Sequence, residues 1–192
     1  MPERLRLYIS AGPDLDLERE FIGQAVAGLP ISRGWAIHYT PGIQERRGVD
    51  PSPILEAHFH LLLLGQDISA PVGWELWTAK RAGRTPTGIA REEGRTLAAQ
   101  AFYRESGLDW IGYRQPVELV ALVQKRLGEA ILSNPVAYGL AMTEWEPLSA
   151  FLKKPDRARG MQAPAGRVDG AGRSGVILTP EDAGKGGVLI KG

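Results

Sequence analysis

One carboxylate, Glu75, follows an apolar run of the chain closely enough to take part in chemistry. The segment from residue 58 to residue 90, HFHLLLLGQDISAPVGWELWTAKRAGRTPTGIA, predicts a strand, a short polar turn, a helix with Glu75 in its first turns, and a second strand. In open α/β sheets, ligands bind beyond the carboxyl ends of the strands. The positive end of the helix dipole keeps such a glutamate ionised, which favours electrostatic stabilisation or nucleophilic attack over general-acid catalysis. In the alternative interpretation, Glu75 complements the helix dipole at the surface and has no other role.

A second group of candidates lies where the first predicted strand ends. Ser10 and Gly12 would let backbone amides approach a phosphate or a ribose there. The acidic residues of the range 14–18 would repel a phosphate unless Arg19 compensates for them. The chain has no G-x-x-x-x-G-K-[ST] motif, so the sequence gives no support for an ATPase.

Aromatic residues and histidines near these positions have two interpretations each. Trp74 and Trp77 are three residues apart, which predicts a shared helix face distinct from that of Glu75. Such pairs usually belong to a core, and the alternative is that Trp74 stacks on a base or a nicotinamide. His58 and His60 alternate along a strand, and the pattern favours a packed or hydrogen-bonded pair over a metal site.

Tyr39 ends the second predicted strand near the same edge of the sheet. A capping or core role is favoured for it, and contact with a ligand is the alternative.

The elements that must position these residues are five strands that alternate with helices. The continuous apolar run 59–64 is typical of a parallel strand covered on both faces. Alternation of this kind predicts an α/β fold, a three-layer sandwich around a five-stranded parallel sheet with right-handed crossovers. The predicted strands are 5–10, 35–39, 59–64, 85–90 and 109–113; the predicted helices begin at Asp14 or Asp16 and end near Leu29, then cover 71–82, 95–104 and 116–132, with a long loop at 41–53.

The composition divides the chain into three parts: an α/β domain at 1–133, a helical extension at 134–156 and a Gly-rich tail at 157–192. In the extension, Pro135 and Pro147 each stand where a helix can begin. The tail has no aromatic residue and contains two short apolar runs, 176–179 and 188–190. We expect it either to lack order by itself or to form a hairpin that pairs with a partner's sheet edge.

Charge and cysteine content exclude several classes of function. The chain has 192 residues, a formal net charge of +1 and no cysteine, which excludes disulfides, thiolate chemistry and Cys-based zinc sites. The Lys and Arg residues are scattered, so we predict no nucleic-acid partner. The longest apolar run, 61–64, is far shorter than a membrane span. The sequence therefore predicts a soluble protein of the cytoplasm.

Taken together, these residues resemble the TIR-like superfamily, and most closely the uncharacterised branch found at the N-terminus of bacterial NACHT and STAND ATPases. The middle of the chain also resembles nucleoside 2-deoxyribosyltransferases. Asp67 and Glu75 match their acidic positions, and the range 79–86 matches their A-x-x-x-G-[KR]-P run, except that Thr85 is inserted before Pro86. In the TIR-like branch the first strand typically ends in two small hydroxyl residues; here Ser10 is followed by Ala11 and Gly12, so the second hydroxyl residue is replaced. The matching positions are Leu7, Tyr8, Ile9 and Ser10, then Glu18, Arg19 and Glu20, then the range 61–65, Ser69, Glu75, Leu76, Ala79, Gly83 and Pro86.

The resemblance implies a domain of a bacterial signalling, defence or assembly system that cleaves the N-glycosidic bond of NAD or a related nucleotide. No cofactor or metal is implied, since NAD or the nucleotide would be the substrate. The alternative is a non-catalytic adaptor whose tail, 157–192, pairs with a partner protein or with another copy. In the enzyme, Glu75 would be the catalytic residue, because a carboxylate stabilises an oxocarbenium-like transition state, and Ser10, Gly12, Tyr39, Asp67, Ser69 and Trp74 would surround the substrate.

Overall fold

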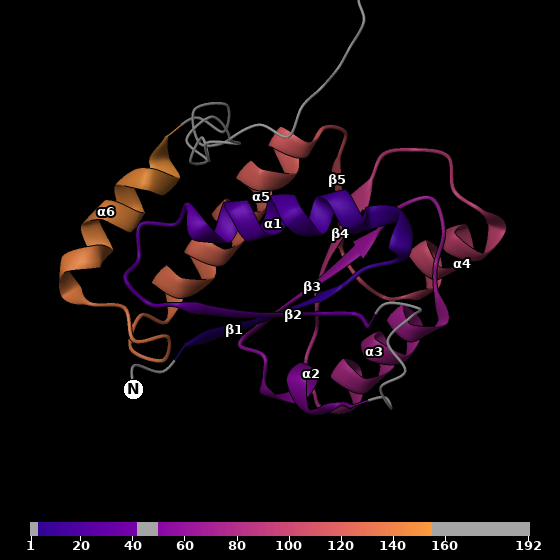
Figure 1. The fold of residues 1–192 in the computed structure, drawn as a ribbon, viewed down its shortest axis with the longest axis horizontal. Helices are drawn as coiled ribbons and strands as arrows, with labels where there is room; N and C mark the ends of the chain where they lie inside the picture. Colours follow the sequence, from indigo (N-terminus) through magenta and orange to yellow (C-terminus); the bar gives the residue numbers. More distant parts are fainter. Residues whose placement is uncertain (1–3, 42–49, 155–192) are drawn as a thin grey trace, which may run out of the picture.

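A parallel sheet runs through the middle of the protein (Figure 1). Residues 4–41 and 50–154, which the computed structural model describes, contribute five strands to it in the order β2-β1-β3-β4-β5. Every neighbouring pair is parallel. The predicted α/β fold with five parallel strands is therefore confirmed. The strands are β1 (Leu5–Ser10), β2 (Trp35–Tyr39), β3 (Phe59–Leu64), β4 (Thr87–Arg91) and β5 (Trp110–Tyr113).

Helices cover both faces of the sheet and form the outer layers of the sandwich (Figure 1). On one face, α1 (Asp16–Ala27) packs beside α5 (Pro116–Ser133), and α6 (Met142–Lys153) packs on α5. The other face is covered by α2 (Ser52–Glu56), α3 (Ala70–Arg81) and α4 (Leu97–Glu105). A single 3-10 turn, Pro13–Leu15, leads from β1 into α1.

The core has two sides because successive strand residues point to opposite faces. Leu7, Ile9 and Leu61 join the large apolar cluster under α1 and α5. Tyr8 and Leu62 point the other way, into smaller clusters beneath α2 and α3. Because both faces of β3 are buried, Leu61 to Leu64 are each at most 1% exposed. Burial on both faces therefore explains the continuous apolar run of β3, as the sequence predicted.

Several predicted boundaries are wrong. The end of the predicted loop 41–53 is already helical, since α2 begins at Ser52. The strand predicted to begin at residue 85 begins at Thr87, because Pro86 has no N–H for the ladder. Pro135 does not begin a helix: the chain turns through Gly139, with φ +61°. Pro147 likewise begins no helix and lies inside α6 instead, where its ring faces solvent.

The helix α6 lies within the predicted helical extension, 134–156. The predictions for the tail at 157–192, including its hairpin and its partner, lie outside the described residues. Within the part of the chain that the structure describes, no helix combines the length and the apolar content that a membrane crossing requires.

Candidate active site

The candidate site lies where the connections of the sheet change direction. Strands β1 and β3 are neighbours in the sheet, but the helices that follow them, α1 and α3, cover opposite faces. In doubly wound sheets, this arrangement opens a crevice beyond the carboxyl ends of the two strands, and ligands bind there. Glu75 of α3 reaches this crevice from one side, and Tyr8 and Ser10 of β1 reach it from the sheet.

Hydroxyl groups surround the Glu75 carboxylate, which is 1% exposed. The Tyr8 hydroxyl donates a hydrogen bond to Oε1 at 2.7 Å, and the Thr40 hydroxyl donates one to Oε2 at 2.8 Å. Ser10 adds a third hydroxyl. The Thr40 oxygen also accepts the backbone N–H of Ala11 at 3.1 Å, so its own proton is directed towards Glu75. A carboxylate has about four acceptor positions, so three donors leave about one for a ligand.

Burial and hydrogen bonding act on Glu75 in opposite directions. Burial raises the pKa of its carboxyl group, while the hydroxyls of Ser10, Tyr8 and Thr40 and the charge of Arg19 lower it, with burial the larger effect. The pKa of the Tyr8 phenol is raised, mainly by burial and also by the negative charge of Glu75. Tyr8 therefore stays protonated and keeps its role as a donor.

His60 of β3 extends this network away from the carboxylate. Its Nε2 lies 2.8 Å from the Ser10 hydroxyl oxygen, and its ring meets the Tyr8 ring edge-on at 5.3 Å. Burial, with the charge of Arg84 as a second cause, lowers the pKa of His60 to about 4. Because Ser10 directs its own proton to Glu75, the neutral imidazole donates its Nε2–H to Ser10. A chain of donors thus runs from His60 through Ser10 to Glu75.

The two histidines predicted as a pair have separate partners. Nδ1 of His58 accepts the backbone N–H of Arg6 at 2.9 Å, whereas His60 bonds to Ser10. Among the residues that the structure describes, no cluster of three or more metal-ligating side chains occurs.

A cavity of about 310 Å³ opens beside Glu75. Its walls are mostly apolar, with Trp74 packed against the buried cluster that contains Tyr8. Asp50 lies at the rim, and the hydrogen bond from the Ser52 backbone N–H lowers the pKa of the Asp50 carboxyl group. A second hollow of about 200 Å³ shares two wall residues with this cavity, Pro41 and Pro71. The cavity beside Glu75 is lined by Tyr8, Pro41, Asp50, Ala70, Pro71, Trp74 and Glu75.

Some of the predicted site residues meet at this cavity. Ser10 hydrogen-bonds to Glu75, and Trp74 lines the same cavity. Ser69 lines the neighbouring hollow. Trp74 and Glu75 therefore line one cavity, although adjacent residues of a helix point about 100° apart. Trp77 is not a core residue: it is 54% exposed, with the Arg81 guanidinium 4.7 Å from the centre of its ring.

Other predicted residues have different surroundings. Asp67 accepts hydrogen bonds from the Thr96 hydroxyl and from the Ile68 N–H, at 2.7 and 2.8 Å, and so joins the end of β3 to α4. Gly12 is buried under the Asp14 carboxylate, which a Cβ at position 12 would meet at 2.6 Å. It supplies a close approach within the loop and does not line the cavity.

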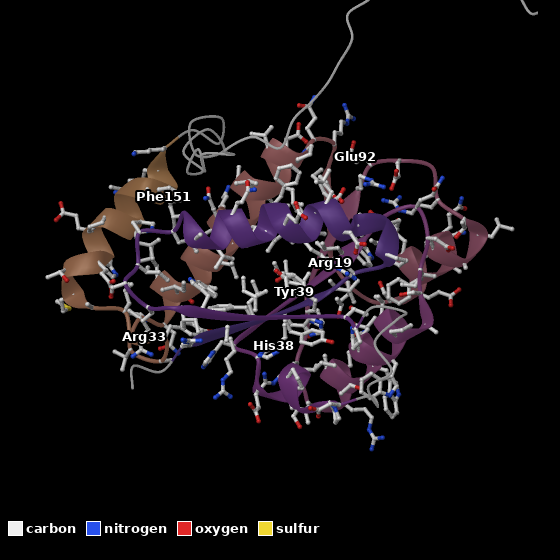
Figure 2. All side chains as sticks on the ribbon, in the orientation of Figure 1. Arg19, Arg33, His38, Tyr39, Glu92 and Phe151 are labelled. Atoms are coloured by element: carbon white, nitrogen blue, oxygen red, sulfur yellow. The ribbon has the colours of Figure 1, made fainter. Side chains whose placement is uncertain are left out.

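Tyr39 lies on the opposite face of the sheet from Glu75. Its hydroxyl is directed to Gly23 of α1, beneath Arg19 (Figure 2). Because alternate residues point to opposite faces, it is the next residue, Thr40, that reaches Glu75.

Tyr8, Thr40 and Asp50 are site residues that were not predicted. Strand alternation contains the signal for Tyr8, since residues 8 and 10 of one strand share a face. No local pattern marks Thr40 or Asp50.

A second buried carboxylate, Glu18 of α1, differs from Glu75 because it forms an ion pair. It is 4% exposed and forms an ion pair with Arg91 at 2.6 Å, while the Tyr113 hydroxyl donates to it at 3.2 Å. Arg91 also pairs with Glu93 at 2.7 Å. Glu18 thus joins α1 to the ends of β4 and β5, and its charge is balanced by a cation.

Comparison of the chain with protein-family models, with curated proteins and with solved structures finds no match.

Proposed function

We propose that this protein cleaves the N-glycosidic bond of NAD or a related nucleotide or nucleoside, with Glu75 as the catalytic carboxylate. One observation carries the proposal. Glu75 is almost completely buried, forms no ion pair with any residue in 4–41 or 50–154, and yet lines a cavity.

A buried carboxylate without a cation is costly, because an ion loses its hydration in a low-dielectric interior. The buried carboxylate of Glu18, which joins elements of the fold, is paired with the Arg91 guanidinium. At Glu75, neutral hydroxyl donors hold the charge instead. A negative charge of this kind is available to a positive charge that develops in the cavity, which supports a role in a reaction.

Cleavage of an N-glycosidic bond develops such a positive charge. The bond between C1′ of the ribose and the base nitrogen breaks, and its electron pair leaves with the base. The ribose ring becomes oxocarbenium-like, and a carboxylate next to C1′ stabilises it or bonds to it before water completes the hydrolysis. Tyr8 and Thr40 hold the two Glu75 oxygens from the sheet side, which orients the carboxylate for this step.

The ionisation of the cavity lining favours one kind of leaving group. Asp50 is the other carboxyl group of the described lining, and its pKa is lowered, so it is ionised at neutral pH and is a poor general acid. A base that already carries a positive charge, such as the pyridinium of NAD, leaves as a neutral molecule without a proton. Trp74 and two carboxylates beside the cavity are suited to a cationic ring.

The size of the cavity favours binding of one nucleoside unit. A volume of about 310 Å³ is at the lower end of the range for small-molecule sites. The remainder of a dinucleotide would extend over the neighbouring hollow, whose lining includes Arg19 and Ser69.

The test is base release from purified protein. NAD, nicotinamide riboside and adenosine are incubated separately, and the free base is measured by chromatography, for the wild type, Glu75→Gln and the matched control Asp67→Asn. Like Glu75, Asp67 follows β3 in the chain, but its carboxylate accepts a hydrogen bond from Thr96 outside the cavity. We expect release from the pyridinium substrates, a loss of at least about a hundredfold in Glu75→Gln, and wild-type rates in Asp67→Asn.

Two results would overturn the proposal: no release from any of the three substrates by folded wild-type protein, or equal rates in Glu75→Gln and the wild type. Either result would favour the alternative from the sequence, a non-catalytic adaptor. Circular dichroism of each variant separates loss of activity from loss of fold.

A further inference from the structure

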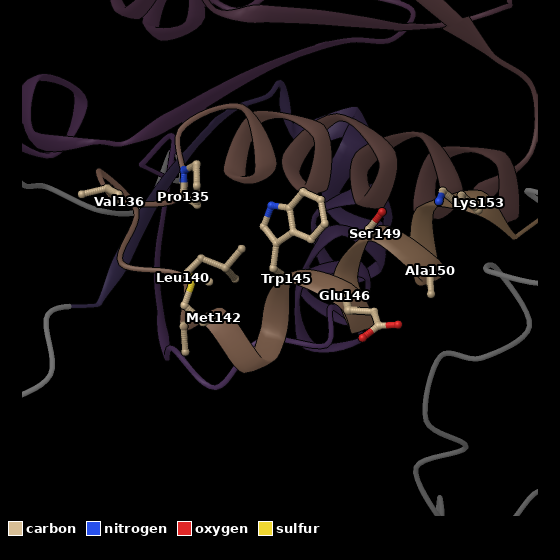
Figure 3. A pocket seen from close by; sticks show the side chains of 10 residues that line it. Pro135, Val136, Leu140, Met142, Trp145, Glu146, Ser149, Ala150 and Lys153 are labelled. Carbon is tan, nitrogen blue, oxygen red and sulfur yellow. The ribbon is translucent and has the colours of Figure 1, made fainter.

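An apolar groove of about 830 Å³ runs along α6, which lies on the side of the molecule away from α3, the helix that carries Glu75 (Figure 1). Figure 3 shows the Trp145 ring in the middle of this groove, with Val136 and Leu140 at one end and Lys153 at the other. Val136 and Met142 are 89% and 92% exposed, and Trp145 is 52% exposed. Contiguous exposed apolar surface of this kind marks an interaction site.

The groove has firm walls because α6 is fixed to the domain by its other face. Leu148 and Phe151 are buried in the main core, and Leu152 lies close over Gly128 of α5. At the start of α6, Glu144 accepts the backbone N–H groups of Ala141, at 2.9 Å, and of Ser32. The exposed residues therefore belong to a well-packed helix with a second apolar face that the described residues leave open.

The chain itself supplies an occupant of suitable composition and position. It continues from Lys154, next to the Lys153 end of the groove. The 21 residues of the range 155–175 span at most roughly 70 Å, whereas α6 is about 18 Å long. The apolar run 176–178 is therefore within reach of every part of the groove, and the tether supplies an effective concentration of about a millimolar or more.

Charges near this run match charges of the groove. Arg173 precedes the run and Glu181 follows it, while the groove contains Glu146 and Lys153. In an extended conformation, two of the three apolar side chains point to one side, where the flat face of Trp145 offers a large contact area.

We propose that the segment Val176–Leu178 docks in the α6 groove of its own molecule. The occupant is a segment of the same chain, and the site is independent of the one that contains Glu75. Docking covers Val136, Met142 and Trp145.

The experiment uses the full chain and two labels. The protein has three methionines and no cysteine, so ¹³C-methyl methionine gives few signals and Thr179→Cys accepts a single nitroxide. A Met142→Leu variant identifies the Met142 signal. We expect the nitroxide to remove most of the Met142 methyl intensity when both labels are in one molecule. A 1:1 mixture of molecules that carry one label each should retain the full signal.

Variants in the tail test the sequence of the occupant. Val176→Asp with Leu178→Asp should restore the Met142 signal in the doubly labelled chain, whereas the matched control, Val188→Asp with Ile190→Asp, should not.

Three results would overturn the proposal. Loss of signal in the mixture would assign the groove to a second copy, and no loss in either sample would assign it to a different partner. Equal restoration of the Met142 signal by both pairs of substitutions would show that residues 176–178 are not the segment that docks in the groove.

Discussion

Replacing Tyr8 with phenylalanine removes a single hydroxyl group from the environment of Glu75. Tyr8 is 4% exposed, and its hydroxyl lies 2.7 Å from Glu75 Oε1. Phenylalanine keeps the ring and its contacts with His60 and Trp74. The change in stability therefore measures the hydrogen bond to the carboxylate.

The expected magnitude depends on the charge of Glu75. A hydrogen bond to an ionised group contributes about 1.5–3 kcal/mol, and one to a neutral group contributes about 1. At pH 8 the variant should lose about 2 kcal/mol of unfolding free energy, or about 4–8 °C in Tm for a chain of this size. The Tyr8 hydroxyl lowers the pKa of Glu75, so its removal raises that pKa further. The loss should therefore decrease towards about 1 kcal/mol as the pH falls through the pKa of Glu75.

The assay is urea unfolding followed by circular dichroism at a series of pH values, with the free energy from linear extrapolation. Tyr113→Phe is the matched control, since Tyr113 is also buried and its hydroxyl donates to a buried carboxylate at the longer distance of 3.2 Å. Glu18 keeps Arg91 in that variant and the Tyr113 hydrogen bond is longer, so the control should lose about 1.5 kcal/mol, the low end for a bond to a charged group. A loss in Tyr8→Phe of only about 1 kcal/mol at every pH, with no decrease as the pH falls, would refute the view that Glu75 is an ionised carboxylate held by hydroxyls.

Two further predictions concern other charged groups. His60, with its pKa lowered from 6.5 to about 4, should remain neutral in NMR titrations until about pH 4, and a midpoint near 6.5 would contradict its burial. Because the folded state resists protonation of His60, the protein should lose up to about 3 kcal/mol of unfolding free energy as the pH falls from 6.5 to about 4. Arg91→Met should cost about 3 kcal/mol because it leaves Glu18 buried without its cation. Adding Glu18→Gln to that variant should recover part of the loss, and a double mutant that is merely additive would show that the pair is not coupled.

The sequence determined the architecture because its signals are local. The continuous apolar run of β3, the breaks at Gly12 and Pro13, and the alternation of strands with helices predicted a parallel sheet without knowledge of any contact. The same local pattern located Glu75 early in a helix that follows a strand. Where a local signal was weak, as at the short helix α2, the prediction failed.

Only the tertiary structure decided the electrostatics of the two buried glutamates. Tyr8 and Thr40, which surround Glu75, are 67 and 35 positions away from it in the chain, and Arg91, which neutralises Glu18, is 73 positions away. Both glutamates are acidic helix residues near the same edge of the sheet, and nothing local separates them. Strand register and the faces chosen by the helices gave a cation to one and hydroxyls to the other, because a pKa depends on neighbours in space.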